Sequence, residues 1–195
     1  MCGRYYIPEP DDDDGFKEIL EHVKKVYGET PLLSEMKRSE IFPTNIVPVV
    51  TDKTPVLMKW GFTRFDGKGH IINARLETAA EKPIFKKAYA AARCLIPAGY
   101  YFEWRKDGNY KTKYAIGRDK PIYMAGLFKY ETGTSLPLFV ILTRPTAPGI
   151  AFIHDRMPVI VPEADRHKWL TAPMDARELL SASDENMSYC EAALI

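Results

Sequence analysis

The second residue of this chain is a cysteine, and loss of the initiator Met1 would turn Cys2 into a 1,2-aminothiol. The α-amine freed in this way has an ordinary pKa of about 7.7–8.0, so a useful fraction is neutral near pH 7. A neutral amine attacks an aldehyde to form an imine, and the adjacent thiol can then close a thiazolidine ring. Since ring closure makes the adduct lasting, the pattern indicates covalent capture of an aldehyde. The ordinary alternative is a cysteine with no special role.

Short motifs that follow Cys2 at characteristic spacings narrow the possibilities. They comprise residues 2–5 (CGRY), 60–61 (WG), 73–75 and 77–78 (NAR and ET), 93–97 (RCLIP), 99–104 (GYYFEW), 125–127 (AGL) and 154–158 (HDRMP). In order and spacing these motifs resemble the SOS-response-associated peptidase family, from Cys2 to about Trp169. The resemblance implies a protein that recognises abasic sites in single-stranded DNA, crosslinks to them through its N-terminal cysteine and shields the lesion in the DNA damage response.

The family name also implies a peptidase, or hydrolase, activity beside the lyase-like crosslinking, so that the chain would remove Met1 itself. Removal of Met1 by a housekeeping aminopeptidase is equally compatible with the sequence. An acidic run at residues 11–14 departs from the better-known members of the family, and we expect it to alter the path of the DNA near the site.

The resemblance assigns catalytic roles to four residues, Cys2, Asn73, Glu103 and His154. Opening the closed abasic sugar and losing water to form the imine both require proton transfer. Histidine ordinarily changes protonation near neutral pH, so we assign His154 to protonating the sugar oxygen or the leaving hydroxyl. Burial among aromatic residues would raise the pKa of Glu103, which we assign to positioning and deprotonating the Cys2 amine, and these two roles are interchangeable. Asn73 is expected to hydrogen-bond the sugar or the Cys2 backbone.

Each of these assignments has an ordinary structural alternative. Glu103 could form a salt bridge on a strand surface, and His154 could be a structural histidine with satisfied hydrogen bonds. For Asn73 the alternative is an Asx turn or a helix cap.

Single-stranded DNA is usually held by arginine or lysine on the phosphates and by flat side chains on the bases. Arg4, Arg75 and Arg156 neighbour three of the catalytic positions in sequence, and we predict that they contact the phosphates beside the lesion. Trp60 and Trp104 are predicted to stack on bases or wedge between them, with a place in the core as the alternative.

The elements that must position these residues follow from hydrophobic periodicity and turn signals. Asp107-Gly108 marks the turn of a hairpin, because glycine tolerates the positive φ that such turns need. Pro48 suggests that its strand lies at a sheet edge. Strands are predicted over residues 2–7, 46–50, 55–60, 93–105, 110–117, 121–128, 136–143 and 157–162. Helices are predicted over residues 16–26, 76–81, 85–92, 162–170 and 174–180.

Length and composition predict one globular domain over residues 1–195, since 46% of the residues are hydrophobic and 27% are charged. The element order predicts an α+β fold with a curved, mostly antiparallel, barrel-like sheet and peripheral helices. The cysteines have no metal-ligand spacing, so we expect a reducing, cytoplasmic compartment, no metal and no cofactor. No stretch approaches the ~20 apolar residues of a membrane span, so no membrane partner is expected.

The net charge of +1 conceals an uneven distribution. Residues 53–113 contain 13 basic and 5 acidic residues, which predicts that a phosphate backbone would bind there. The same residues could instead form an ordinary solvated face. The rival functions are an N-terminal-nucleophile cysteine amidohydrolase acting on a small amide, and a non-covalent DNA-binding module in which Cys2 has no role. Only the first of these rivals also needs a freed Cys2.

Overall fold

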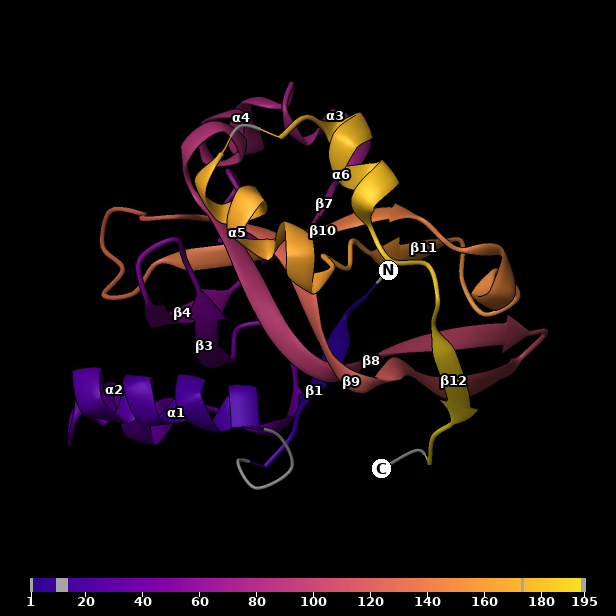
Figure 1. Cartoon of the computed structure of the whole chain (residues 1–195), viewed down its shortest axis with the longest axis horizontal. Helices are drawn as coiled ribbons and strands as arrows, with labels where there is room; N and C mark the ends of the chain where they lie inside the picture. The colour runs from indigo at the N-terminus through magenta and orange to yellow at the C-terminus, as the bar shows by residue number, and fades with distance from the viewer. Residues whose placement is uncertain (1, 10–13, 173, 194–195) are drawn as a thin grey trace.

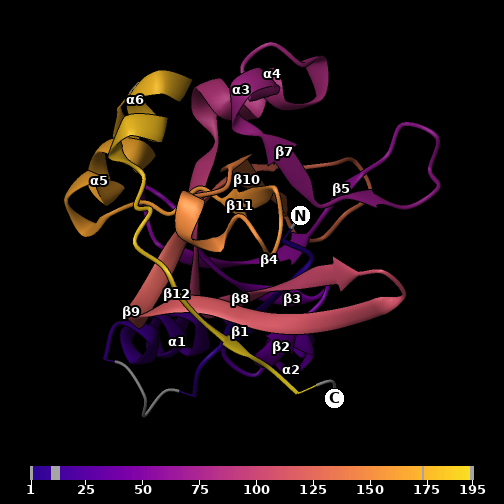
Figure 2. The same ribbon diagram turned by 90° about the vertical axis from the view of Figure 1, so that its right-hand side faces the viewer.

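The computed structural model describes residues 2–9, 14–172 and 174–193. Met1 and most of the acidic run at residues 11–14 lie outside these ranges. Within them the chain forms a large curved sheet, a two-stranded sheet and short helices (Figure 1). Helices α5 and α6 lie together on one side of the sheet, whereas α1 lies at the opposite end of the molecule (Figures 1 and 2).

The large sheet closes on itself as a barrel. Its strands are ordered β12-β9-β10-β4-β3-β8-β1-β2, and an additional pairing of β9 with β8 joins five of them into a ring. Closure pairs each of the five ring strands on both sides, and β2 and β12 lie at the ends of the sheet outside the ring. Only β10 makes parallel pairs among the described strands, with β4 and β7, so the predicted α+β fold with a mostly antiparallel, barrel-like sheet is confirmed.

The strands follow the predicted segments closely, with short additional strands between them. Their bounds are Arg4–Ile7 (β1), Ser39–Ile41 (β2), Ile46–Val50 (β3), Pro55–Trp60 (β4), Phe62–Thr63 (β5), His70–Ile71 (β6), Asn73–Arg75 (β7), Arg93–Asp107 (β8), Tyr110–Lys129 (β9), Leu138–Pro145 (β10), Arg156–Pro158 (β11) and Ser188–Glu191 (β12). Strand β3 lies between β4 and β8, so the edge position suggested by Pro48 is wrong. The pairing of β3 with β8 is confined to Val50 and Leu95. Pro48, which has no backbone N–H to donate, therefore lies where β3 makes no hydrogen bonds to β8.

The predicted hairpin is the longest feature of the sheet. Strands β8 and β9 pair from Arg93 with Leu127 to Asp107 with Tyr110, and Gly108 in the turn has a φ of 57°. A glycine adopts this left-handed conformation without steric cost. The two strands predicted at 110–117 and 121–128 are one continuous strand, β9, which bends beside an irregularity in β8.

The bend depends on Gly117. A Cβ atom at Gly117 would lie 2.9 Å from the Gly99 carbonyl oxygen and 2.8 Å from the Tyr100 Cβ atom. Glycine therefore allows the two backbones to approach each other where the pairing register shifts.

The helices are peripheral, as predicted. Their bounds are Asp14–Tyr27 (α1), Pro31–Glu35 (α2), Leu76–Ala79 (α3), Pro83–Ala91 (α4), Glu163–Thr171 (α5) and Ala176–Ala182 (α6), with a 3₁₀ turn at Pro148–Ile150. Helix α1 buries Phe16, Ile19, Leu20 and Val23 along one face. It ends at Tyr27, and the N–H of the following Gly28 donates to the Lys24 carbonyl oxygen. Among the described residues, no helix has the length and apolar character needed to cross a membrane.

The core has two main parts. One fills the barrel and includes Cys2, Tyr5, Trp60 and Tyr101, while the other lies between the sheet and helices α4 and α5. Cys2, the first described residue, therefore lies inside the barrel, where the surrounding core fixes its position.

Candidate active site

Cys2 is held at the start of β1 by contacts to two different strands. Its side chain has no exposed surface, and its thiol donates a weak hydrogen bond to the Arg4 carbonyl oxygen, with Sγ 3.7 Å from that oxygen. The Cys2 carbonyl oxygen accepts a hydrogen bond from Nδ2 of Asn73 on β7 at 2.9 Å. Burial, reinforced by the nearby charge of Glu103, raises the pKa of the Cys2 thiol, so the thiol is neutral at physiological pH.

Glu103 enters the site from β8. Its side chain is buried, and this desolvation raises the pKa of its carboxyl, with His154 opposing the shift. Oε2 of Glu103 lies 4.0 Å from Nε2 of His154, which is beyond a direct hydrogen bond and at the outer limit of an ion pair.

His154 lies in the loop that precedes β11, where both of its protonation states have a partner. Nδ1 lies 3.0 Å from the backbone nitrogen of Arg156, which donates to it, and 2.8 Å from Oδ1 of Asp155. In the neutral ring Nδ1 accepts the Arg156 N–H, so Nε2 carries the proton that faces Glu103. In the protonated ring Nδ1 donates to Asp155. The surroundings therefore accommodate a histidine that gives and takes a proton.

Glu103 and His154 face the same open cavity, which has a volume of about 570 Å³. Strand β1 stops pairing with β8 at Arg4, which lies opposite Phe102. The cavity lies beside the part of β8 that follows this pair. The lining residues are Gly3, Arg4, Glu103, Trp104, Lys106, Lys111 and His154. An indole and several cations thus surround a carboxyl group and an imidazole, a composition suited to an anionic, partly aromatic ligand.

Lys106 and Lys111 are functional candidates that the sequence predictions did not single out. They face each other across the β8–β9 hairpin, one pair from the turn. Counting back from the Asp107-Gly108 turn would have paired them, and both belong to the basic segment at residues 53–113.

The three predicted phosphate-binding arginines have different surroundings. Arg4 forms an ion pair with Glu40 at 3.1 Å, and its guanidinium lies over the Trp104 ring at the cavity. Arg75 is exposed at the end of β7, beside Asn73.

Arg156 points into the protein instead. Its guanidinium donates to both carboxylate oxygens of Glu77, at 2.6 and 2.9 Å, and to the Thr143 carbonyl oxygen at 2.6 Å. Only 11% of its side chain is exposed. Arg156 thus connects β11 to α3 and β10, which fixes the strand that follows His154.

The two predicted tryptophans also differ. Trp104 is half-buried and lines the cavity, so its ring is available to a ligand. Trp60 is fully buried, donates from Nε1 to the Ile72 carbonyl oxygen at 3.0 Å, and packs on Tyr5 and Phe139. This position fits the core alternative for Trp60 and offers no ring face to a base.

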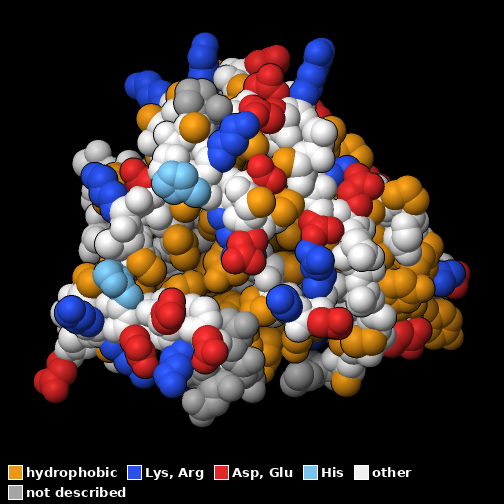
Figure 3. Space-filling model, in the orientation of Figure 1, with side chains coloured by type: hydrophobic (Ala, Val, Ile, Leu, Met, Phe, Trp, Pro, Cys, Tyr) orange, Lys and Arg blue, Asp and Glu red, His pale blue; other side chains and the backbone are white. Residues whose placement is uncertain are grey.

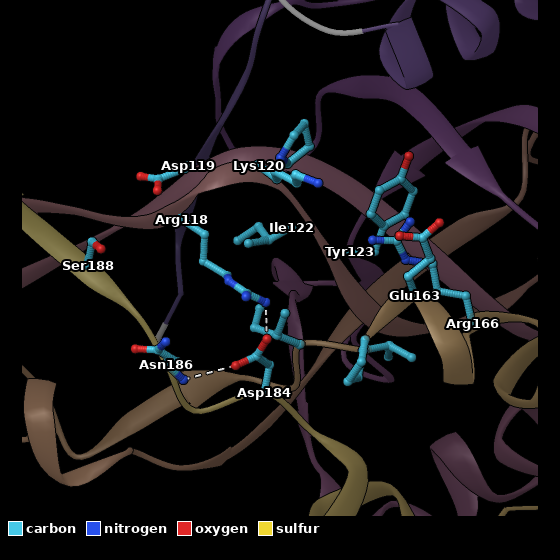
Figure 4. Close-up of a pocket in the computed structure, with 14 residues that line it drawn as sticks. Arg118, Asp119, Lys120, Ile122, Tyr123, Glu163, Arg166, Asp184, Asn186 and Ser188 are labelled. Carbon is cyan, nitrogen blue, oxygen red and sulfur yellow. Dashed lines mark hydrogen bonds and ion pairs between the residues drawn. The ribbon is translucent and has the colours of Figure 1, made fainter.

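A second cavity, of about 550 Å³, lies between β9, α5 and the segment that leads to β12 (Figure 4). Two of its cations have partners within the cavity: Arg118 pairs with Asp184, and the Arg166 guanidinium lies 3.7 Å from the Tyr123 ring centroid. None of the predicted site residues lines it. Among the described residues no group of His, Cys, Asp or Glu side chains could hold a metal ion.

Comparison with known proteins agrees with the motifs. Residues 1–193 match the SOS response associated peptidase (SRAP) family. "Abasic site processing protein YedK" of Escherichia coli (strain K12) is 30% identical over 200 residues, which cover 97% of this chain and 87% of that protein. "Abasic site processing protein YoaM" of Bacillus subtilis (strain 168) is 36% identical over 204 residues, covering 94% and 87%.

Solved structures share the fold. A protein from Bacteroides thetaiotaomicron superposes with a TM-score of 0.82 at 24% identity, covering 98% of this chain and 92% of that chain. A phage-related protein from Bordetella bronchiseptica has a TM-score of 0.74 at 26% identity, covering 99% and 95%.

Proposed function

This chain belongs to the SOS response associated peptidase family, and from that premise we propose that it captures abasic sites in single-stranded DNA as a covalent thiazolidine at Cys2. The adduct shields the lesion during the DNA damage response. The observation that carries the proposal is that Glu103 and His154 face one basic cavity, while the buried Cys2, hydrogen-bonded to Asn73, lies close enough to Glu103 for the carboxylate charge to act on its thiol. Relatives that are named abasic site processing proteins support it.

The reaction needs two proton-transfer groups. His154 protonates the ring oxygen of the abasic sugar while the anomeric hydroxyl loses its proton, which restores the protonated imidazole, so that the hemiacetal opens to an aldehyde. The neutral Cys2 amine attacks the aldehyde carbon, and Glu103 accepts the proton that the amine loses. His154 then protonates the departing hydroxyl, which leaves as water when the imine forms. The raised pKa of the buried Glu103 carboxyl suits it to holding that proton near neutral pH.

Ring closure makes the product durable. The Cys2 sulfur adds to the imine carbon, forming a C–S bond, while the thiol proton ends on the imine nitrogen, so the only molecule released overall is water. Because burial keeps the thiol protonated, its proton must be relayed, and Glu103, whose charge acts on the thiol, is the assigned base that accepts it. Asn73 holds the Cys2 carbonyl, while its Oδ1 is buried without a hydrogen-bond partner in the described ranges. Oδ1 is therefore available to a sugar hydroxyl or to the Cys2 amine.

The DNA backbone is held by the cations around the cavity. Three cations line it, Arg4, Lys106 and Lys111. Arg75 is exposed and follows Asn73 by two residues. Trp104 provides a ring on which a neighbouring base can stack. Arg156 acts as a positioning residue for His154, since Glu77 and Thr143 already occupy its guanidinium.

A peptidase activity that releases Met1 follows from the family name, with Glu103 and His154 as the groups that would transfer protons. Intact-mass analysis of Glu103→Gln tests it. Self-removal predicts that this variant retains its methionine, whereas complete loss of methionine from the variant would assign the step to an aminopeptidase.

The crosslink is tested by mixing the protein with an abasic single-stranded oligonucleotide and running a denaturing gel. We expect a slower band that survives denaturant and is absent in Cys2→Ala. Cys190→Ala, which removes an exposed cysteine, is the matched control and should crosslink normally. A shift seen only on native gels would mean a non-covalent DNA-binding module. The absence of any shift, together with turnover of small amides, would mean an amidohydrolase.

A further inference from the structure

An aromatic group lies on the surface next to the catalytic loop. Phe152 and Tyr189 are 44% and 48% exposed, although both are large apolar rings. Their centroids lie 5.1 Å apart, and both rings pack against buried Tyr114 in edge-on geometry. We call these three residues the aromatic platform. Figure 3 shows hydrophobic side chains gathered on the right-hand side of the molecule, where the β8–β9 hairpin and the loop before β11 lie in Figure 1.

The aromatic platform is built from the same segments as the candidate site. Phe152 precedes His154 by two residues in one loop, and Tyr114 is paired with Glu103 across the hairpin, so their side chains share a face of the sheet. Arg105 follows Glu103 by two residues in β8 and therefore also lies on this face, about 7 Å further along the strand. Its guanidinium lies 5.8 Å from the Phe152 ring centroid.

The platform adjoins the cavity at Glu103, on the face of β8 opposite to Trp104 and Lys106, and it places a cation beside exposed rings. Arg105 pairs with Asp107 at 3.6 Å, but both side chains are largely exposed, so this ion pair is weak and a phosphate can replace the carboxylate. The acidic groups nearby are Asp155 in the loop and Glu191, which accepts a hydrogen bond from the Tyr114 hydroxyl. Asp155 contacts His154 and Glu191 contacts Tyr114, so each carboxylate already has a partner.

We propose that Phe152 and Tyr189 stack on an unpaired base next to the abasic nucleotide, while Arg105 contacts the adjoining phosphate. This inference rests on the proposed function, because it extends the DNA path from the cavity. Exposed aromatic rings flanked by arginine are the usual means of holding a single strand without reading its sequence. The C-terminal strand β12 thereby contributes to lesion binding, since it supplies Tyr189 by pairing with β9.

The test separates binding from chemistry. An oligonucleotide with a tetrahydrofuran abasic analogue, which has no aldehyde, carries 2-aminopurine at one position beside the analogue, on either side in turn. We expect wild-type protein to quench the fluorescence on one side. Tyr189→Ala and Phe152→Leu should abolish that quenching and weaken binding by about tenfold. Phe152→Leu keeps an apolar side chain in the loop, and Tyr189 contacts no assigned catalytic residue.

Tyr130→Ala is the matched control, because Tyr130 is 77% exposed and lies outside the platform. It should bind and quench as wild type does. Wild-type affinity and quenching in both platform variants would overturn the proposal, as would a change in oligomeric state without a change in DNA binding. If wild-type protein quenches 2-aminopurine but forms no crosslink with a natural abasic site, the proposed function fails while the platform stands.

Discussion

Among the described acidic residues, Glu103 is the one that is buried and whose carboxyl pKa is raised. It is buried in a strand, beside the histidine and the aminothiol with which it is proposed to act. The sequence predicted both its burial and the direction of its pKa shift, because it stands among aromatic residues in a strand pattern. The 4.0 Å approach to His154 could not be predicted, because a loop 51 positions later in the chain provides that partner.

Replacing Glu103 with glutamine should remove proton transfer while keeping the shape of the side chain. We expect the crosslinking rate to fall by about 10²–10⁴-fold, the usual contribution of a general acid or base. In wild-type protein the rate should rise with pH through the raised pKa of Glu103, as the carboxylate forms. The part of the rise that comes from the carboxylate should be missing from Glu103→Gln, whose rate should follow ionisation of the Cys2 amine alone. Rate measurements from pH 4 to 8 at saturating oligonucleotide check this, and identical profiles would contradict the assigned base.

The same substitution should affect stability in the opposite direction. Because the folded-state pKa of Glu103 is raised above the ordinary 4.5, the folded protein binds the proton more tightly than the unfolded chain. Its stabilising effect is complete below pH 4.5 and is lost as pH rises through the raised value. The glutamine in Glu103→Gln does not titrate, so the variant does not lose this stabilisation. As pH rises from 4.5 through the raised pKa, its free energy of unfolding should therefore increase relative to that of wild type. Urea denaturation at several pH values measures the difference, and a constant difference would argue against a raised pKa.

At the scale of elements, β11 and the loop before it decide where His154 lies. Arg156 connects this segment to α3 and β10 through Glu77 and Thr143. Its position beside His154 in sequence suggested a phosphate contact, but sequence proximity does not reveal the direction of a side chain. The acidic partner, Glu77, is distant in sequence and comes close only through the pairing of β7 with β10.

Arg156→Lys tests whether this arginine positions His154 or contacts DNA. A lysine cannot make the two-pronged contact to Glu77, so we expect a loss of about 1–3 kcal/mol in the free energy of unfolding and slower crosslinking. The salt dependence of DNA affinity should not change. Because lysine keeps the positive charge, the phosphate contact is tested with Arg156→Gln: a decrease of about 0.7 in its slope of log affinity against log salt, with unchanged stability, would instead mark Arg156 as a phosphate contact.

The hairpin and the helices were the most predictable elements, since Asp107-Gly108 and the apolar spacing of α1 are local signals. The continuity of β9 was not predictable. Residues 118–120 are polar and resemble a turn, yet the strand passes through them because it pairs with β8 on both sides of the bend. Gly117 allows this close approach, and its role depends on residues of the other strand.

At the scale of the whole molecule, the closed barrel gathers basic residues of a nearly neutral chain around one cavity. The excess of 13 basic over 5 acidic residues at positions 53–113 predicted a phosphate-binding region. It did not predict which cations line the site. Sequence likewise could not show that Trp60 is buried, because its ring packs on Tyr5 and Phe139, which come from distant strands.

The double variant Lys106→Ala/Lys111→Ala should weaken binding of single-stranded DNA and reduce its salt dependence. Each lost phosphate contact lowers the slope of log affinity against log salt by about 0.7, so we expect a decrease of about 1.4. Fluorescence anisotropy over a salt series measures it. Lys53→Ala/Lys68→Ala removes two exposed lysines that do not line the cavity and serves as the control. Equal slopes in both double variants would show that the cavity lysines do not contact phosphates.

Intact-mass and peptide-mapping mass spectrometry of the purified adduct is the most direct test of covalent capture at the aminothiol. We predict a chain that lacks Met1 and is heavier by the abasic oligonucleotide minus one water, with the DNA-derived group on the peptide that begins at Cys2. An adduct of the same mass on a chain that still carries Met1, or on any other residue, would contradict the account.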